Sequence, residues 1–172
     1  VVSEQLPAND LGAWSITTKP YDPLVREGDC YSFVLRANPV RTPNQREHSR
    51  KRHDVILDAR RQLKESGIPR DQWPTNMQLA QEHGFLWLQQ RAESCGFSFA
   101  TSTEGDPVAI VESYKQQKFF KKENPKPVTI SVLDFRGILT VTDPVLFKEK
   151  LFHGIGRGKA FGCGLMLIRR VS

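Results

Sequence analysis

The sequence predicts an α+β domain of the ferredoxin-like type, in which a four-stranded antiparallel sheet has helices on one face. Three observations favour this fold class. From Gly28 onward, the apolar patterns follow one another in the RRM-like order strand, helix, strand, strand, helix, strand. Turn-forming Gly, Pro, Asn and Asp residues separate these segments. Hydrophobic residues make up 38% of the 172 residues, which is enough for a packed core.

Four segments have the composition of strands. The first is GDCYSFVLRANP, residues 28–39, in which alternate positions are apolar and Pro39 ends the pattern. The next two, PVAIVESY and VTISVLDFRGILTV, read as a β-hairpin, with Gly137 at a bulge. The last strand is LMLIRRV, close to the end of the chain.

Helix signals lie between the strands. Asp54 is placed to cap a helix that Gly67 stops. Thr75 and Gln78 have the spacing of a capping box for a second helix, and Gly96 is a natural stop for it. We expect an apolar stripe on this second helix, formed by Met77, Ala80, Trp87, Leu88 and Ala92.

A third helix, in TDPVLFKEKLFHG, is capped by Asp143 or Thr142, has Pro144 in its first turn and ends at Gly154. The remaining segments predict a division of the chain into three parts. Residues 1–10 read as a strand left over from a preceding domain, 11–27 as an inter-domain linker, and 28–172 as the ferredoxin-like domain. The chain begins with Val1 in a strand-like pattern, so we expect further residues upstream.

The charge of the chain favours an anionic partner. Its formal net charge is +6, and 16 of its 25 Lys and Arg residues fall in three stretches, 41–52, 115–126 and 148–170. No apolar run approaches the roughly 20 residues of a membrane-spanning helix, and no signal peptide is visible. The three widely spaced cysteines form no disulfide framework. We therefore expect a cytoplasmic protein with no membrane partner.

The hairpin and the preceding loop are the first candidate RNA-binding elements. Runs of charge are usually solvated surface, but here Tyr114, Phe119 and Phe120 stand among the lysines. Aromatic rings can stack on bases while ammonium groups pair with phosphates. The candidate RNA-binding residues are Lys115, Lys118, Lys121, Lys122, Lys126, Arg157, Lys159, Arg50, Lys51 and Arg52.

The segment HGIGRGKAFGCGL contains the second candidate element, a glycine-rich loop. Its glycines are Gly154, Gly156, Gly158, Gly162 and Gly164. It is not a Walker A loop, because Ala160 follows Lys159 where Ser or Thr is required. Glycines allow positive φ and a close approach of the backbone to an anion, while the alternative is a helix stop followed by a tight turn.

No catalytic constellation is evident among these residues. His48 and His53 have no cysteine nearby, so we expect no zinc site, and the scattered carboxylates disfavour a two-metal nuclease. His83 reads as a packed or surface residue. His153 adjoins the glycine-rich loop, but its place at a helix C-terminus is explained by the helix dipole. We expect neither a metal nor a cofactor.

Several of these segments together resemble one family. YSFVLRANPV followed by a basic loop with KRHDV, FLWLQQRAESCGF, and above all the GIGRGKAFGCGL block are similar in order to segments of the CasE proteins. These are CRISPR-associated endoribonucleases of the Cascade complex, which serves antiviral defence. The resemblance implies two tandem ferredoxin-like domains, of which this chain contains the second. It gives Arg36 and Asn38 either a structural role or an RNA contact.

The resemblance also implies a function. Such a nuclease binds the repeat stem-loop of precursor CRISPR RNA and cuts at its 3′ base without a metal. The ribose 2′-OH attacks the phosphate, which leaves a 2′,3′-cyclic phosphate and a 5′-OH, and the enzyme stays bound with other Cascade subunits. The family's acid–base histidine falls upstream of Val1, so the catalytic residues of this sequence are unknown, and we expect this fragment to bind without efficient cleavage.

Two alternatives remain open. The chain could be a non-catalytic ferredoxin-like RNA-binding subunit, which would bind a stem-loop tightly and yield no product. It could also be a basic module for acidic proteins, which would show no preference for hairpin over single-stranded RNA.

Overall fold

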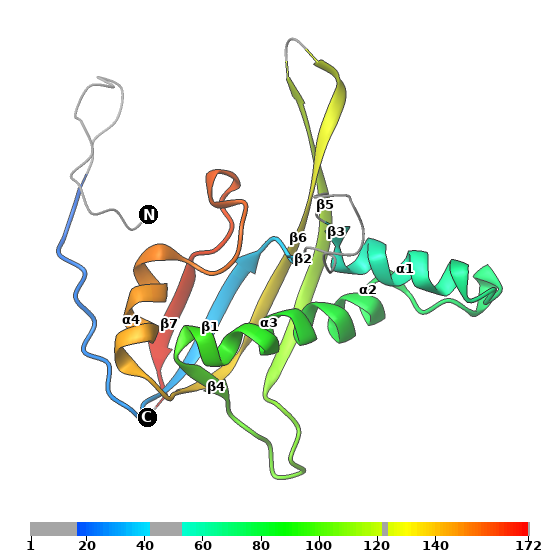
Figure 1. The fold of residues 1–172 in the computed structure, drawn as a ribbon. Coiled ribbons are helices and arrows are strands. Elements are labelled where there is room, and N and C mark those ends of the chain that lie inside the picture. The colour runs from blue at the N-terminus through cyan, green and yellow to red at the C-terminus, as the bar shows by residue number, and fades with distance from the viewer. Residues whose placement is uncertain (1–16, 42–52, 122–123, 172) are drawn as a thin grey trace.

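The computed structural model describes residues 17–41, 53–121 and 124–171, which form one antiparallel sheet with helices packed on one face (Figure 1). Strand β1 (Cys30–Ala37) lies between β7 (Met166–Arg170) and β6 (Asn124–Val141), and β5 (Ala109–Lys121) pairs with the other edge of β6. This order, β7-β1-β6-β5, is the split βαβ order of a ferredoxin-like fold. The predicted fold class is confirmed.

Two segments form the helical layer on this sheet. The first contains α1 (Val55–Glu65) and a 3₁₀ turn, η1 (Arg70–Gln72), followed by the chain of short helices α2 (Asn76–Leu79), η2 (Ala80–Gly84), α3 (Phe85–Ala92) and η3 (Glu93–Cys95). The second is α4 (Pro144–His153), which lies beside β7 and β1 in Figure 1. None of the described helices is long and apolar enough to cross a membrane.

Alternation along the strands places the core between the sheet and this helical layer. In β1, Tyr31, Phe33, Leu35 and Ala37 are buried, whereas Val34 and Arg36, which alternate with them, are exposed. Fully buried side chains of β6, the helices and the short strand β4 (Phe97–Phe99) complete the core, among them Leu88, Phe97, Leu133, Phe135, Leu139, Phe147 and Leu151. The opposite face of the sheet has no helix over it in the described part of the chain (Figure 1).

The predicted helix signals hold, because capping is a local interaction. The Asp54 carboxylate accepts hydrogen bonds from the backbone N–H groups of Ile56 and Leu57 at the start of α1. The Thr75–Gln78 capping box is present, and Asp143 caps α4 through Val145 and Leu146.

The second predicted helix differs in two respects. A π turn, η2, interrupts it where a Cβ on Gly84 would lie 2.3 Å from the Leu133 side chain, so the helix passes unusually close to the sheet. Met77 is exposed, whereas the other residues of the predicted stripe are buried. The prediction for Met77 was wrong because Leu79 faces the core in this turn, and Met77, about 200° away around the helix, faces solvent.

The bulge predicted at Gly137 was also misplaced. The extra residue is Glu112 in β5, where the pairing with β6 shifts register. Gly137 instead allows close strand contact, because a Cβ there would lie 2.4 Å from the Val108 carbonyl oxygen. Three short strands were not predicted: β2 (Val40–Arg41), β3 (His53–Asp54) and β4 (Phe97–Phe99).

Of the predicted leftover strand and linker, residues 1–16 lie outside the described residues. Residues 17–27 contain no helix or strand and run along α4. Tyr21 packs edge-on against Phe152 of α4, and Lys148 of the same helix pairs with Asp22. The Tyr31 hydroxyl donates a hydrogen bond to the Leu24 carbonyl, which ties this segment to the sheet.

The β5–β6 hairpin extends well beyond the sheet (Figure 1). Strand β1 ends at Ala37, which pairs with Leu133, so residues 124–132 of β6 pair with β5 alone. The sequence reading placed the basic segment 115–127 in the connection, whereas 115–121 belong to β5. We call residues 115–121 and 124–132 the hairpin arm.

Candidate nucleic-acid interface

The glycine loop, residues 154–164, lies over the end of β1. Its five glycines all have φ between +74° and +97°, a region that favours glycine. The loop is closed by a hydrogen bond from the Ile155 N–H to the Gly164 carbonyl, and the Gly164 N–H donates to the Arg36 carbonyl. Arg157 forms an isolated β-bridge with Asn38.

Close packing as well as backbone conformation requires glycine in this loop. A Cβ on Gly156 would lie 2.9 Å from the Trp87 ring, and one on Gly158 would lie 3.3 Å from the Asn38 side chain. The loop is therefore a defined structure built against the helical layer and β1, which goes beyond a simple helix stop.

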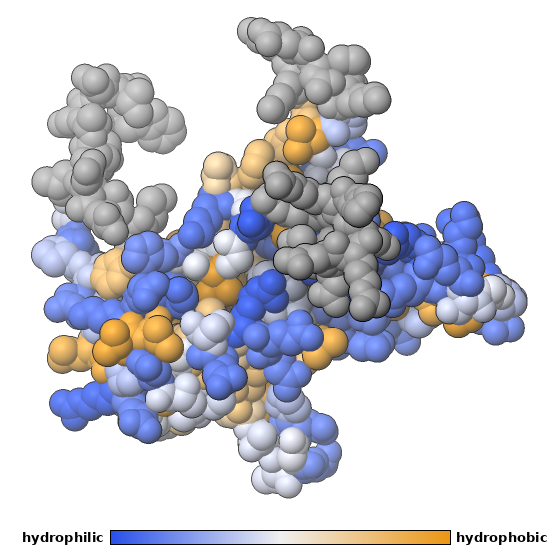
Figure 2. Space-filling view, viewed as in Figure 1, coloured by the Kyte–Doolittle hydropathy of each residue, from blue (hydrophilic) through white to orange (hydrophobic). Residues whose placement is uncertain are grey.

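The hairpin arm and the glycine loop are in contact. The rings of Phe119 in β5 and Phe161 in the short helix η4 (Lys159–Phe161) have their centroids 4.9 Å apart. Hydrophobic surface on the arm lies beside the tip of the loop in the space-filling view (Figure 2). Both elements were predicted from the sequence as candidate binding elements, and in the structure they lie in contact on one side of the molecule.

A buried amide fixes the base of the arm. The Asn38 side chain, which is buried, donates a 2.6 Å hydrogen bond from Nδ2 to the Ser131 carbonyl. Asn38 thus contacts the arm through its side chain and Arg157 through its backbone. Of the two roles open for the RANP motif, the structure favours the structural one at Asn38.

Arg36 also has a structural partner. Its guanidinium forms two hydrogen bonds with Asp134, 2.7 and 3.1 Å long, and Ser113 Oγ donates to the same carboxylate. The hydrogen bonds from Arg36 lower the pKa of Asp134, with smaller contributions from Ser113 and Lys115. The carboxylate therefore stays ionised and holds β1, β5 and β6 together where the arm begins.

The predicted basic residues are only partly gathered. Lys115 and Lys118 are exposed but lie on opposite faces of β5, because side chains three positions apart in a strand point to opposite sides. Arg157 and Lys159 are exposed on the glycine loop. Lys118, Arg157 and Lys159 form no ion pair with any residue that the structure describes.

The other predicted RNA-binding residues lie either at the end of the arm or outside the described residues. Lys121 and Lys126 belong to β5 and β6 at the end of the arm. Lys122, Arg50, Lys51 and Arg52 lie outside the described residues.

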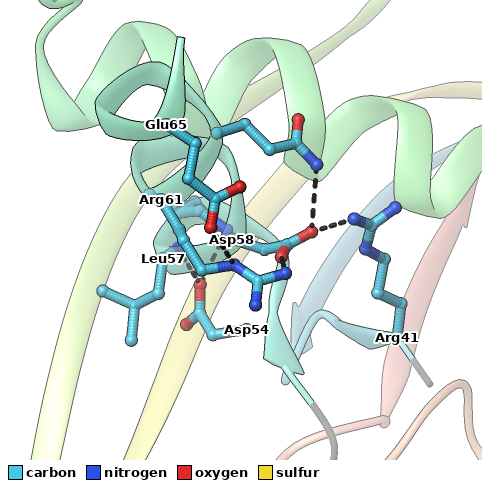
Figure 3. A network of polar contacts seen from close by, with 8 residues as sticks. Arg41, Asp54, Leu57, Asp58, Arg61 and Glu65 are labelled. Carbon is cyan, nitrogen blue, oxygen red and sulfur yellow. Dashed lines mark hydrogen bonds and ion pairs between the residues drawn. The ribbon is translucent and has the colours of Figure 1, made fainter. Parts of the chain in front are cut away.

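A polar network that sequence reasoning missed includes Arg41, the last residue of β2 and the first of the basic stretch 41–52 (Figure 3). The buried Asp58 carboxylate of α1 accepts hydrogen bonds from Arg41, Arg61 and Gln62. Arg41 is the one residue of the stretch 41–52 that the structure describes. The spacing of Asp58 and Arg61 is a helical ion-pair signal, but nothing local in the sequence identifies Arg41 as a partner.

The β2–β3 ladder and a tryptophan hold the two ends of that segment together. Val40 pairs with Asp54, and Arg41 with His53, so the two described residues that flank 42–52 lie side by side. The Trp87 indole N–H donates a 3.0 Å hydrogen bond to the Val40 carbonyl, and the Arg91 guanidinium lies 4.2 Å from the Trp87 ring centroid.

The described histidines do not form a catalytic group. His53 lies in β3, His83 lies beside Glu82 in η2, and His153 Nδ1 is 3.0 Å from the Glu149 carbonyl oxygen, one helical turn earlier. The described residues include no group of three or more His, Cys, Asp and Glu side chains placed to hold a metal ion.

The open face of the sheet has a hollow of about 670 Å³, but its exposed lining has no aromatic ring. Its lining includes the exposed apolar side chains of Val34, Ile110 and Leu167, together with Arg136 and Arg169. RNA-binding sheets of the RRM type stack bases on aromatic residues of this face. The lining therefore differs from such a stacking surface, and the arm with the glycine loop is the better candidate interface.

Comparison with known proteins gives a consistent result. A family model described as "CRISPR associated protein" matches residues 1–170. The chain is 27% identical over 165 residues to the CRISPR system Cascade subunit CasE of Escherichia coli K12, covering 95% of this chain and 70% of that protein. It is 26% identical over 153 residues to the CRISPR-associated endoribonuclease Cse3 of Thermus thermophilus, covering 87% and 60% respectively.

Solved structures share the fold. Cse3 bound to a 19-nucleotide RNA superposes with a TM-score of 0.65 at 24% identity, over 90% of this chain and 62% of that one. Cas6e from E. coli K-12 gives 0.56 at 22% identity, over 98% and 75%. A family model matches residues 1–170, and the two relatives, CasE and Cse3, are both CRISPR proteins. The chain therefore belongs to the CRISPR-associated proteins of the CasE family.

Proposed function

We propose that this chain is the RNA-binding portion of a CRISPR repeat endoribonuclease that works in the cytoplasm. Residues 28–172 would bind the stem-loop of the CRISPR repeat in precursor RNA. The protein would then stay with the mature RNA as a subunit of Cascade. The family membership of the whole chain supports this proposal, as do the names of relatives that are an endoribonuclease and a Cascade subunit.

The contact between the hairpin arm and the glycine loop is the structural observation that supports RNA binding most directly. It joins two elements that together contain the exposed cations Lys115, on the same face of β5 as Phe119, Lys118 on its other face, and Arg157 and Lys159 on the loop. A folded RNA presents phosphates on both sides of its helix, so cations on two adjoining elements can pair with them at the same time. The candidate RNA-binding residues named from the sequence are therefore retained in this proposal.

The proposed reaction needs no metal ion. The ribose 2′-OH beside the scissile bond attacks the phosphorus at the 3′ base of the stem, and the 5′ oxygen of the next nucleotide leaves. The products are a 2′,3′-cyclic phosphate and a 5′-OH. In this proposal the described residues bind and orient the RNA, and the acid–base histidine is contributed by residues that precede Val1.

Binding and cleavage are tested separately. A repeat stem-loop RNA is incubated in EDTA with the 172-residue chain and with the full translated reading frame of its gene. We expect both proteins to bind and only the longer one to cut. Loss of cutting by the longer protein in EDTA would exclude the metal-free reaction, while binding without product from both would favour the non-catalytic RNA-binding subunit.

Paired lysine variants test the position of the interface. We expect Lys121→Ala with Lys122→Ala to weaken stem-loop binding more than Lys148→Ala with Lys150→Ala. The second pair is a matched control, because Lys148 pairs with Asp22 and Lys150 with Glu149, away from the arm. Equal losses from the two pairs would argue against the arm as a binding element.

A further inference from the structure

The hairpin arm is a two-stranded element with little support of its own. Residues 124–132 of β6 have β5 as their sole strand partner among the described residues. An isolated two-stranded hairpin is marginally stable at best in water. The direction in which the arm points must therefore depend on its few contacts with the rest of the protein.

Two contacts hold the arm, one at its base and one nearer its tip. At its base, Asn38 donates to the Ser131 carbonyl. Further out, the Phe119 ring packs against Phe161 at 4.9 Å, and among the described residues this is the ring contact that joins the arm to another element. Phe119 pairs with Val128 across the hairpin, close to its tip.

The glycine loop holds Phe161 in place for this contact. Phe161 ends the single turn η4, and Gly158 and Gly162 on either side of that turn both have φ of +76°. Gly158 packs near Asn38 and Cys163, so the turn is anchored to the end of β1. The loop therefore projects an aromatic ring from a fixed base toward the arm.

We propose that Phe161 is a positioning residue, which fixes the hairpin arm relative to the glycine loop through its ring contact with Phe119. This inference rests on the proposed RNA-binding function. The contact sets the separation between the cations of the arm and those of the loop before RNA arrives. RNA then binds without first ordering the arm, which lowers the entropic cost of association.

The expected effect is moderate, because both rings are partly exposed: 37% for Phe119 and 43% for Phe161. An aromatic pair of this kind corresponds to about a three- to tenfold change in an equilibrium constant. Loss of the pair should therefore weaken the arm without unfolding the domain.

The first test uses the protein free of RNA. We expect Phe161→Ala to speed amide hydrogen exchange about three- to tenfold in residues 115–119 and 128–132, and to leave β1 unchanged. Phe152→Ala is the matched control, because it removes a ring contact with Tyr21 at 5.6 Å, on α4. Unchanged exchange in the arm of Phe161→Ala would overturn the proposal.

The second test measures stem-loop RNA affinity in a double-mutant cycle. Phe119→Ala and Phe161→Ala should each raise Kd about three- to tenfold, and the double variant should bind no worse than either single variant. Phe161→Leu, which keeps an apolar side chain, should stay within about twofold of the parent. Additive losses would overturn the proposal, since they would mean that the two rings act on RNA independently.

The two tests separate this inference from the proposed function. If the parent protein fails to bind the stem-loop, the proposed function is wrong, and the exchange measurement still decides whether Phe161 holds the arm. If the parent binds and the control Phe152→Ala loses as much affinity as Phe161→Ala, the positioning role is excluded.

Discussion

At the scale of single residues, Asp58 is a buried carboxylate that binds side chains from two different segments of the chain. It is the buried carboxylate of the described part of the chain, with only 4% of its side chain exposed, and it receives Arg41 and Arg61. A buried carboxylate without partners would be strongly unfavourable, so these two arginines offset the cost of burying its charge.

Asp58→Asn should lower the free energy of unfolding by about 2 kcal/mol. The loss stays below that of a fully buried pair, because Arg41 and Arg61 are about half exposed and can turn toward water. Urea denaturation measures the change. Glu65→Gln is the control: its carboxylate is 65% exposed, so it should cost less than about 0.5 kcal/mol. Similar losses from both variants would contradict this assignment.

Asp134 predicts a pH dependence of stability. The hydrogen bonds from Arg36 hold its pKa below the ordinary 3.8. A lowered carboxyl pKa stabilises the fold above the ordinary value, and this stabilisation is lost as the pH falls through the lowered pKa.

The difference in unfolding free energy between the parent and Asp134→Asn should therefore be constant near neutral pH and shrink below about pH 4. Denaturation at a series of pH values measures it. A difference that persists unchanged in strong acid would mean that the ion pair is not its source.

At the scale of elements, helix ends were predictable because their signals are local. Gly96 and Gly67 both end helices with positive φ, +73° and +71° respectively. They differ in their surroundings: a Cβ on Gly96 would lie 2.4 Å from the Asp143 carbonyl oxygen, whereas a Cβ on Gly67 would meet nothing within 4 Å.

Gly67→Ala should therefore cost about 1 kcal/mol, the strain of a left-handed backbone with a side chain. Gly96→Ala should cost about 3 kcal/mol or more, because the added methyl group also displaces the start of α4. Chemical denaturation of the two variants compares these costs directly, and equal values would show that backbone strain alone explains glycine at both sites.

At the scale of the whole molecule, the distribution of charge matters more than its sum. The net charge of +6 favours an anionic partner, but Lys148 and Lys150 are already paired with acids. Arg157 and Lys159 make no ion pair within the described residues, and they are the loop cations that we propose for phosphate contact.

Stem-loop affinity should fall steeply as the salt concentration rises. The measured quantity is the slope of log Kd against log salt concentration. Replacing Arg157 and Lys159 together by Ala should reduce the magnitude of that slope by about 1 to 2, since each phosphate contact contributes about 0.7 to 0.9. Binding titrations at several salt concentrations measure the slope. An unchanged slope would exclude these residues from phosphate contact.

The sequence by itself determined the order of the four long strands and the helices, the caps at Asp54 and Thr75, and the two elements of the candidate interface. These features could be predicted because alternation, capping and clustered charge are properties of neighbouring residues. The family resemblance depended on similarly local motifs, chiefly the block around Gly154 to Gly164.

Only the tertiary structure decided how those elements meet. The Phe119–Phe161 contact, the pairing of Arg41 with Asp58 and the close approach at Gly84 all join residues that are distant in sequence. The length of the hairpin arm was likewise missed, because a strand that extends into solvent has no buried face to produce an apolar pattern. Such contacts depend on the packing of the whole chain, which no local pattern of residues specifies.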